Sequence, residues 1–190
     1  MKNIAIFASG SGTNAERIAR HFENSTTVCV KLILTNNPKA GVLERAEKLN
    51  IVTVIFDRNT FYYSDEIVET LKENQIGLVV LAGFLWLVPS NILKLYANRI
   101  VNIHPALLPK FGGKGMYGHH VHEAVLAAGE PKSGITIHLV NEKYDEGRII
   151  FQAEVPVEPD DTPDSLADKI HQLEHRHFPP VIEKLISELP

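Results

Sequence analysis

The segment Asn102-Ile103-His104-Pro105 places an amide and an imidazole two residues apart, a spacing that suits catalysis. It closes an apolar run from Arg99 to His104, which predicts a short strand ended by the proline. Because side chains alternate across a strand, Asn102 and His104 are expected to project to the same side. A hydrogen-bond donor and a proton carrier would then face one point. This pairing suits a reaction that places negative charge on a carbonyl oxygen.

Asp145, in the segment from Asn141 to Gly147, is a carboxylate that could complete this pair. A carboxylate near an imidazole favours the protonated ring, so His104 could then act as a general acid or stabilise an oxyanion. Local sequence alone favours simpler interpretations, a solvated turn aspartate and a surface histidine at a strand end. The catalytic hypothesis therefore requires a fold that brings the two segments together.

A glycine-rich segment, Ser9-Gly10-Ser11-Gly12-Thr13-Asn14, directly follows the first apolar run and opens the first helix. Free N–H groups and the helix dipole favour an anion there. A dinucleotide site is disfavoured because the second strand ends in Thr35-Asn36-Asn37, without the expected acid. A Walker loop is excluded because Gly113-Lys114 is followed by Gly115. The segment therefore predicts a monophosphate site, assisted by Thr13 and Asn14, with a tight turn that binds no ligand as the alternative.

The first half of the chain alternates apolar runs of strand length with segments of helical periodicity. The expected strands are Asn3–Ala8, Val28–Leu34, Val52–Phe56, Gly77–Ala82 and Arg99–Ile103, and the expected helices are Asn14–Phe22, Gly41–Leu49, Phe61–Asn74 and Ser90–Ala97. This order predicts an α/β fold with an open, mostly parallel, twisted sheet and helices on both faces. Ligands bind at the carboxyl ends of such strands, so the glycine-rich segment and the Asn102–His104 pair are expected at one edge.

The second half predicts a helix over His119–Ala128, strands over Gly134–Val140 and Arg148–Val155, and a last helix. That helix begins at Thr162-Pro163 and, broken by Pro179-Pro180, continues towards Leu189.

Several histidines and one tryptophan are further candidates for site residues. His171 and His175 share a helix face, but the sequence His171-Gln172 lacks the glutamate of the two-histidine zinc motif, so no metal is expected. His119, His120 and His122 likewise lack a ligand pattern. Trp86 is expected in the core, with an apolar slot for a flat ring system as the alternative.

The composition is that of one ordinary globular domain, residues 1–190, with 44% hydrophobic and 22% charged residues. Nineteen basic and 23 acidic residues give a net charge of −4, so neither nucleic acid nor a membrane surface is an expected partner. The lone Cys29 is expected to be a buried core thiol in a reducing compartment. No signal peptide or membrane span is evident, so we expect a cytoplasmic protein.

Taken together, these segments resemble the phosphoribosylglycinamide formyltransferase family, the folate-dependent formyl transfer enzymes of purine synthesis. The resemblance extends from Asn3 to about Ile182. It is carried by Ser9-Gly10-Ser11-Gly12-Thr13-Asn14, Leu81-Ala82-Gly83-Phe84, Asn102-Ile103-His104-Pro105-Ala106-Leu107-Leu108-Pro109, Asp145-Glu146-Gly147 and Glu174-His175. The resemblance implies a Rossmann-like formyltransferase domain with an antiparallel C-terminal strand.

The resemblance also implies an activity: transfer of a formyl group from 10-formyltetrahydrofolate to the amine of 5'-phosphoribosylglycinamide, without a metal. By resemblance the catalytic residues are Asn102, His104 and Asp145. The implied substrate-binding residues are Gly12, Thr13, Asn14, His171, Gln172, Leu173 and Glu174. The implied folate-binding residues are Arg58, Leu85, Trp86, Leu87, Val88, Asn102, Asn141, Glu142, Lys143, Tyr144 and Asp145.

This chain departs from the family pattern in two places. The family usually has a Met-Arg pair where this chain has Leu85-Trp86, and the insert from Gly112 to Tyr117 is longer than in some members. Both differences concern the folate slot and leave the catalytic set intact. The expected partners are the two small substrates, and the expected assembly is a monomer or a homodimer.

Three other functions remain as alternatives. A formyltetrahydrofolate deformylase would send water to the same formyl group, but those enzymes carry an added N-terminal regulatory domain, whereas Met1 directly precedes the first strand. A formyltransferase acting on initiator methionyl-tRNA would need a C-terminal basic module. A sensor that binds a phosphorylated ligand without catalysis would need only the glycine-rich segment.

Overall fold

The computed structural model describes residues 1–189, and its centre is one seven-stranded sheet. The strands are β1 (Lys2–Phe7), β2 (Val28–Thr35), β3 (Val52–Ile55), β4 (Ile76–Leu81), β5 (Ile100–His104), β6 (Lys132–Leu139) and β7 (Ile149–Pro156). Their spatial order is β3-β2-β1-β4-β5-β6-β7. The first five strands of that order pair in parallel, β6 runs antiparallel to β5, and β7 runs antiparallel to β6. The predicted open, mostly parallel sheet is confirmed.

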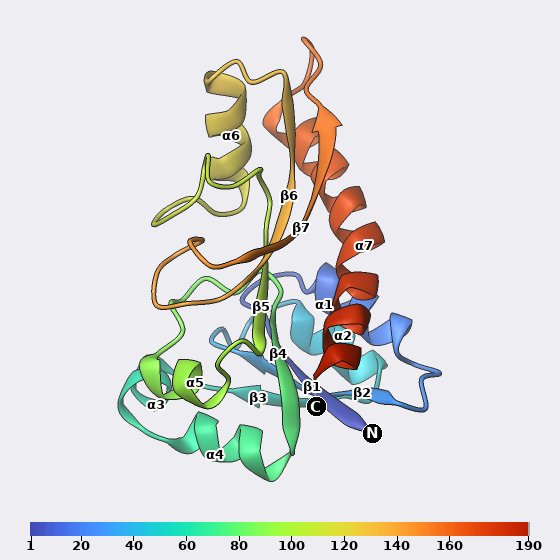
Figure 1. The fold of residues 1–190 in the computed structure, drawn as a ribbon, viewed down its shortest axis with the longest axis vertical. Coiled ribbons are helices and arrows are strands. Elements are labelled where there is room, and N and C mark those ends of the chain that lie inside the picture. The colour runs from blue at the N-terminus through green and yellow to red at the C-terminus, as the bar shows by residue number, and fades with distance from the viewer. Residues whose placement is uncertain (190) are drawn as a thin grey trace.

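Helices cover both faces of this sheet, as predicted (Figure 1). They are α1 (Thr13–His21), α2 (Val42–Lys48), α3 (Arg58–Tyr63), α4 (Glu66–Glu73), α5 (Ser90–Leu95), α6 (His119–Ala127) and α7 (Pro163–Glu188). One core contains buried side chains of α1, α2, α6 and α7, and the opposite core contains those of α3, α4 and α5. Burial on both sides explains why β4 is a continuous apolar run.

The segment predicted as one helix from Phe61 to Asn74 is two helices, so that prediction was wrong. The Asp57 side chain accepts from the Thr60 N–H at 2.8 Å and starts α3 before the predicted position. Ser64 then adopts an extended backbone, donates from its hydroxyl to the Thr60 carbonyl at 2.9 Å and accepts from the Glu66 N–H at 3.3 Å. One serine therefore ends α3 and supports the start of α4.

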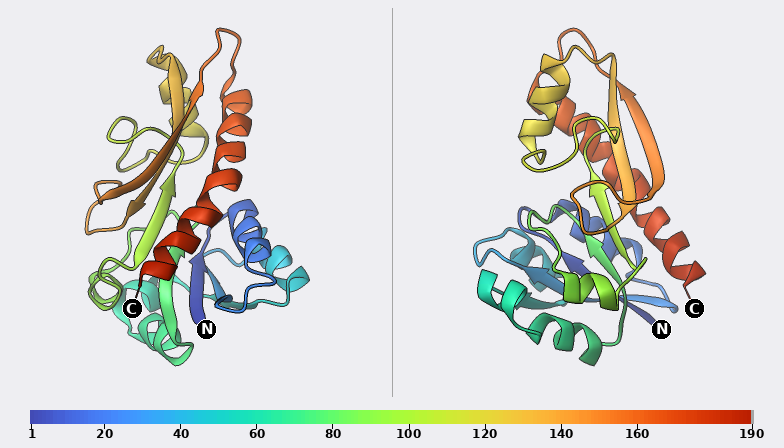
Figure 2. Two further views of the ribbon diagram at one scale, coloured as in Figure 1. Left: turned by 45° about the vertical axis from the view of Figure 1, so that its right-hand side comes forward. Right: turned by 60° about the vertical axis from the view of Figure 1, so that its left-hand side comes forward.

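The last helix, α7, is continuous through Pro179 and Pro180, so the predicted break is absent. Its start is as predicted, with a capping box between Thr162 and Ser165 and with Pro163 in the first turn. Figure 2 shows α7 crossing the molecule from the β6–β7 end to the edge where both chain ends lie. The two prolines have no N–H to donate within the helix. Buried side chains before and after them pack α7 against the sheet and keep it continuous.

Two smaller features complete the fold. Cys29 on β2 is half-buried rather than a fully buried core thiol, because it alternates with Val28 and Val30, which face the core. Within residues 1–189, no helix combines the length and apolar character that a bilayer crossing requires.

Candidate active site

A cavity of about 510 Å³ opens where β1, β4 and β5 end. That volume is in the range usual for small-molecule sites. The glycine-rich segment Gly10–Asn14, the segment Leu81–Val88 and the end of β5 form part of its wall. The remaining wall comes from residues 113–118, α6, the end of β6, the β6–β7 loop and α7. The predicted phosphate segment and the predicted catalytic pair therefore share one cavity.

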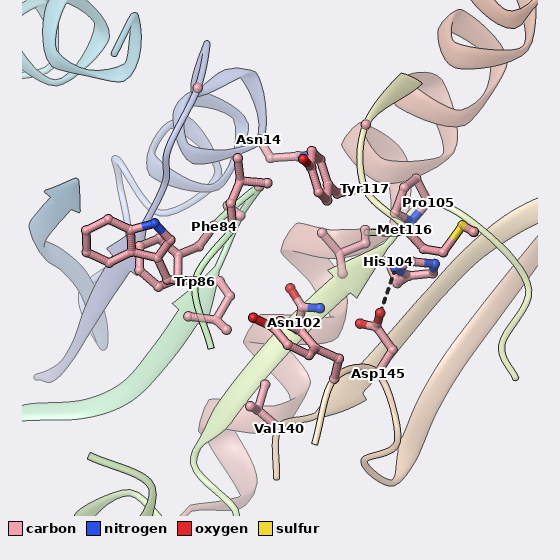
Figure 3. A pocket seen from close by; sticks show the side chains of 18 of the residues that line it. Asn14, Phe84, Trp86, Asn102, His104, Pro105, Met116, Tyr117, Val140 and Asp145 are labelled. Atoms are coloured by element: carbon pink, nitrogen blue, oxygen red, sulfur yellow. Dashed lines mark ion pairs between the residues drawn. The ribbon is translucent and has the colours of Figure 1, made fainter. Parts of the chain in front are cut away.

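Asn102 and His104 both line this cavity, as strand alternation predicted (Figure 3). The Asn102 amide nitrogen lies 3.1 Å from Nε2 of His138, which is its direct partner on β6. Nδ1 of His138 lies 2.9 Å from the Leu139 carbonyl oxygen and therefore carries a proton. In the neutral ring, Nε2 is then an acceptor for the Asn102 amide. His138 thus fixes which way the Asn102 amide faces and leaves a second amide hydrogen free to bind a ligand.

Asp145 reaches the same point from the loop between β6 and β7. Its Oδ2 lies 3.5 Å from Nδ1 of His104, and its Oδ1 lies 3.5 Å from Nε2 of His138. The Gly113 N–H donates to Oδ2 at 2.9 Å. Asp145 has a left-handed backbone, with φ of 56°, which turns its side chain back towards the sheet. The three polar groups predicted to act together therefore meet.

Burial and the neighbouring groups act in opposite directions on the pKa values of His104 and Asp145. Burial lowers the pKa of His104, and this effect outweighs the attraction of the Asp145 carboxylate and the hydrogen bond to the Phe111 carbonyl. Burial works to raise the pKa of Asp145, but the neighbouring His138 and His104 rings and the Gly113 N–H together hold it below its ordinary value. Burial therefore opposes the charged ring that was predicted for His104, whereas the acceptors beside both of its nitrogens, Asp145 and Phe111, favour it, and its charge at neutral pH stays a prediction.

The second ring nitrogen of His104 also has a partner. Nε2 lies 2.7 Å from the carbonyl oxygen of Phe111, in the segment that connects β5 to α6, and therefore donates to it. The same segment is tied to the sheet by the Leu108 N–H, which donates to the Thr136 hydroxyl at 3.0 Å. The residues after Pro105 thus form part of the site wall and fix the orientation of the imidazole.

The glycine-rich segment opens α1, and Gly12 at its N-cap has a left-handed backbone with φ of 77°. The first N–H groups of a helix have no partner within the helix, and they face an anion favourably. The Asn14 amide donates to Oε2 of Glu174 on α7 at 2.8 Å. Glu174 is buried, and burial raises its pKa against the Asn14 hydrogen bond and the nearby His171. This part of the wall thus presents backbone donors beside a polar group of unusually high proton affinity.

On the other side of Asn102 the wall is apolar and aromatic (Figure 3). It is formed by Phe84, Leu85, Trp86, Val88 and Val140. The Trp86 ring packs at 6.0 Å from Tyr62 and 6.1 Å from Phe56, so it belongs to both the core and the cavity wall. This slot fits a flat ring system in size and character.

Most of the predicted site residues come together at this cavity, and five do not. The wall contains Gly12, Thr13, Asn14, Leu85, Trp86, Leu87, Val88, Asn102, His104, Lys143, Tyr144, Asp145, His171 and Glu174. Arg58 packs over the Tyr62 and Trp86 rings at 5.4 and 5.6 Å, behind the slot. Asn141 accepts from the Lys143 N–H, Glu142 and Gln172 are exposed, and Leu173 packs against the core.

Sequence reasoning missed two histidines of the wall. His138 had no local signal, because its importance follows only from its pairing with Asn102 across β5 and β6. His122 lacks a metal-ligand pattern, yet it is buried on α6 and lines the cavity, and within residues 1–189 its Nδ1 has no hydrogen-bond partner. Burial and the neighbouring His171, His119 and His104 lower the pKa of His122 to about 4.

Comparison with known proteins gives relatives along nearly the whole chain. A family model described as formyl transferase matches residues 2–182. The chain is 40% identical over 193 residues to the chloroplastic phosphoribosylglycinamide formyltransferase of Arabidopsis thaliana, aligned over 98% of this chain and 66% of that protein. It is 36% identical over 192 residues to the enzyme of the same name from Bacillus subtilis, aligned over 98% of this chain and 96% of that protein.

Solved structures agree with these relatives. The crystal structure of phosphoribosylglycinamide formyltransferase from Bacillus halodurans superposes with a TM-score of 0.88 and 42% identity, covering 98% of this chain and 96% of that chain. The crystal structure of the enzyme of the same name from Streptococcus pneumoniae superposes with a TM-score of 0.86 and 39% identity, covering 97% of this chain and 99% of that chain. The chain spans about two thirds of the chloroplastic relatives, 66% and 62% of their lengths. The chain therefore belongs to the formyl transferase family, in its phosphoribosylglycinamide formyltransferase branch.

Proposed function

We propose that this chain transfers a formyl group from 10-formyltetrahydrofolate to the amine of 5'-phosphoribosylglycinamide, as a single cytoplasmic domain over residues 1–190. One observation carries the proposal: a single cavity holds a backbone anion site, an amide–imidazole–carboxylate set and an apolar slot. The phosphate would bind at Gly12, Thr13 and Asn14, with Glu174 and His171 beside the sugar and amine. The folate would occupy the slot at Leu85–Val88.

The reaction requires stabilisation of charge on the formyl oxygen when the amine attacks. Asn102 supplies an amide hydrogen whose direction His138 fixes, so no reorganisation is needed as the charge develops. His104 can add a second donor once its Nε2–H leaves the Phe111 carbonyl. Asp145, ionised at neutral pH, accepts the proton that the amine loses. The folate supplies the formyl carbon and takes up a proton at the nitrogen from which this carbon departs.

The decisive test is to mix the protein with 5'-phosphoribosylglycinamide and 10-formyltetrahydrofolate and to follow loss of the formyl group from the folate. Turnover that requires the ribonucleotide, with formylated product, is the expected result. Turnover that proceeds equally without the ribonucleotide would identify a deformylase. Binding of ribonucleotide with no turnover would identify a sensor and contradict the proposal. Sedimentation of the same sample would distinguish a monomer from a homodimer.

A further inference from the structure

The N-terminal part of α2 contacts the glycine-rich segment through two hydrogen bonds to its backbone. The Val42 N–H donates to the Gly10 carbonyl at 3.2 Å. Nε of Arg45 donates to the Ser11 carbonyl at 2.8 Å. The guanidinium of Arg45 also pairs with Glu16 on α1. Two successive carbonyl groups of the segment are therefore held on the side of α2.

These two bonds decide where the intervening N–H groups point. In a trans peptide unit the C=O and the following N–H point in opposite directions. With the carbonyls of Gly10 and Ser11 turned to α2, the N–H groups of Ser11 and Gly12 are turned away from it. Residues 10–14 line the cavity on that side. Among the described residues, neither N–H donates to a backbone acceptor.

Close packing between α2 and the segment leaves little freedom for another arrangement. A Cβ atom added to Gly12 would lie 2.7 Å from the Cα of Val42, and one added to Gly41 would lie 3.3 Å from the Ser11 Cα. The backbone of α2 is therefore a rigid support behind the segment. Arg45 adds a side-chain hydrogen bond from this helix to the Ser11 carbonyl.

We propose that Arg45 is a positioning residue for the substrate phosphate. Its bond to the Ser11 carbonyl orients the Ser11–Gly12 peptide so that the Gly12 N–H faces the phosphate, and Arg45 itself does not touch the substrate. This role rests on the proposed function, because it assigns the phosphate of the ribonucleotide to the glycine-rich segment. Arg45 is absent from the cavity wall, so its proposed role is to orient this peptide.

The test compares Arg45→Met with Arg20→Met. Arg20 is a matched control, because it also pairs with Glu16 and carries the same charge, yet it makes no bond to the glycine-rich segment. Arg45→Met is expected to raise KM for the ribonucleotide about tenfold with little change in kcat or in KM for the folate. Arg20→Met is expected to change KM by less than about threefold. Equal effects of the two changes would overturn the proposal.

A second measurement separates orientation of the phosphate site from general damage. For the substrate analogue that lacks the phosphate, kcat/KM of Arg45→Met is expected to equal that of the unchanged protein. An equal loss of kcat/KM for both substrates would overturn the proposal, whether or not the variant also has a lower melting temperature.

Binding of ribose 5-phosphate, followed by calorimetry, keeps the inference testable apart from catalysis. The unchanged protein should bind this probe about tenfold more tightly than Arg45→Met, whether or not formyl transfer occurs. If this difference in affinity is measured but no formyl transfer occurs, only the proposed function is contradicted. Equal affinities would contradict only the role of Arg45.

Discussion

Nδ1 of His104 lies 3.5 Å from Oδ2 of Asp145, which joins the end of β5 to the loop between β6 and β7. Both side chains are largely buried, with exposed fractions of 4% and 11%. Burial disfavours a charged ring more strongly than the carboxylate favours it. The pKa of His104 therefore lies below its ordinary value although a carboxylate lies beside the ring.

The Asp145→Asn change should lower kcat by about 10² or more, because it removes a proton acceptor from the reacting amine. It should also move the acid limb of kcat/KM to lower pH. The carboxylate raises the pKa of His104, so its loss lowers that pKa further below its ordinary value. Steady-state rates across the acid range measure both effects. An acid limb that moves to higher pH would contradict this effect of the carboxylate.

Removal of the Asn102 side chain in Asn102→Ala should reduce kcat by about 10² to 10³, the usual effect of losing one donor to an oxyanion. The fold should survive, because Asn102 is only half-buried at the cavity wall. The matched change His138→Ala leaves the amide in place but removes the ring that orients it. It should lower kcat less than Asn102→Ala does. Near-normal turnover of Asn102→Ala would remove Asn102 from the catalytic set.

Relative to the unchanged protein, the Glu174→Gln variant should gain more stability at neutral pH than at acid pH. Burial raises the folded pKa of Glu174 above its unfolded value. The folded protein therefore binds that proton more tightly, and the associated stability is lost as pH rises through the folded pKa. Glutamine has no such titration, so the difference in melting temperature, variant minus unchanged protein, should grow with pH. A difference that is constant with pH would contradict a raised pKa.

Gly12→Ala should destabilise the protein by about 2 kcal/mol or more, since Gly12 has a left-handed backbone and its Cβ would meet Val42. Gly10→Ala is the matched control, because a Cβ there would meet nothing within 4 Å. Denaturant unfolding of the two variants gives the comparison. Equal losses of stability in the two variants would contradict this account, because they would show that the contact with α2 is not what excludes a side chain at Gly12.

The sheet and the shared direction of Asn102 and His104 were predictable because each depends on a strong local pattern. Continuous apolar strands indicate a doubly covered sheet, and strand alternation places Asn102 and His104 on one side. The strand-end rule then brings the glycine-rich segment to the same edge. These three inferences need no knowledge of how distant segments pair.

The remaining features depend on tertiary contacts that local patterns do not contain. His138 becomes important only through the antiparallel pairing of β6 with β5. The buried state of His104, which sets its proton affinity, comes from the packing of residues after Pro105. Packing also overrides propensity in α7, where Pro179 and Pro180 lie inside an unbroken helix. Arg58, a predicted folate contact, packs over the Trp86 ring, a contact that no local pattern indicates.

The position of β5 between a parallel neighbour and an antiparallel neighbour has one further consequence. A slip of β5 by a single residue would turn both polar side chains out of the cavity and apolar ones into it. No intermediate placement exists, since the strand has only two faces. The hydrogen-bonded ladders on either side of Asn102 thus make the placement of Asn102 and His104 at the cavity an all-or-none property of sheet assembly.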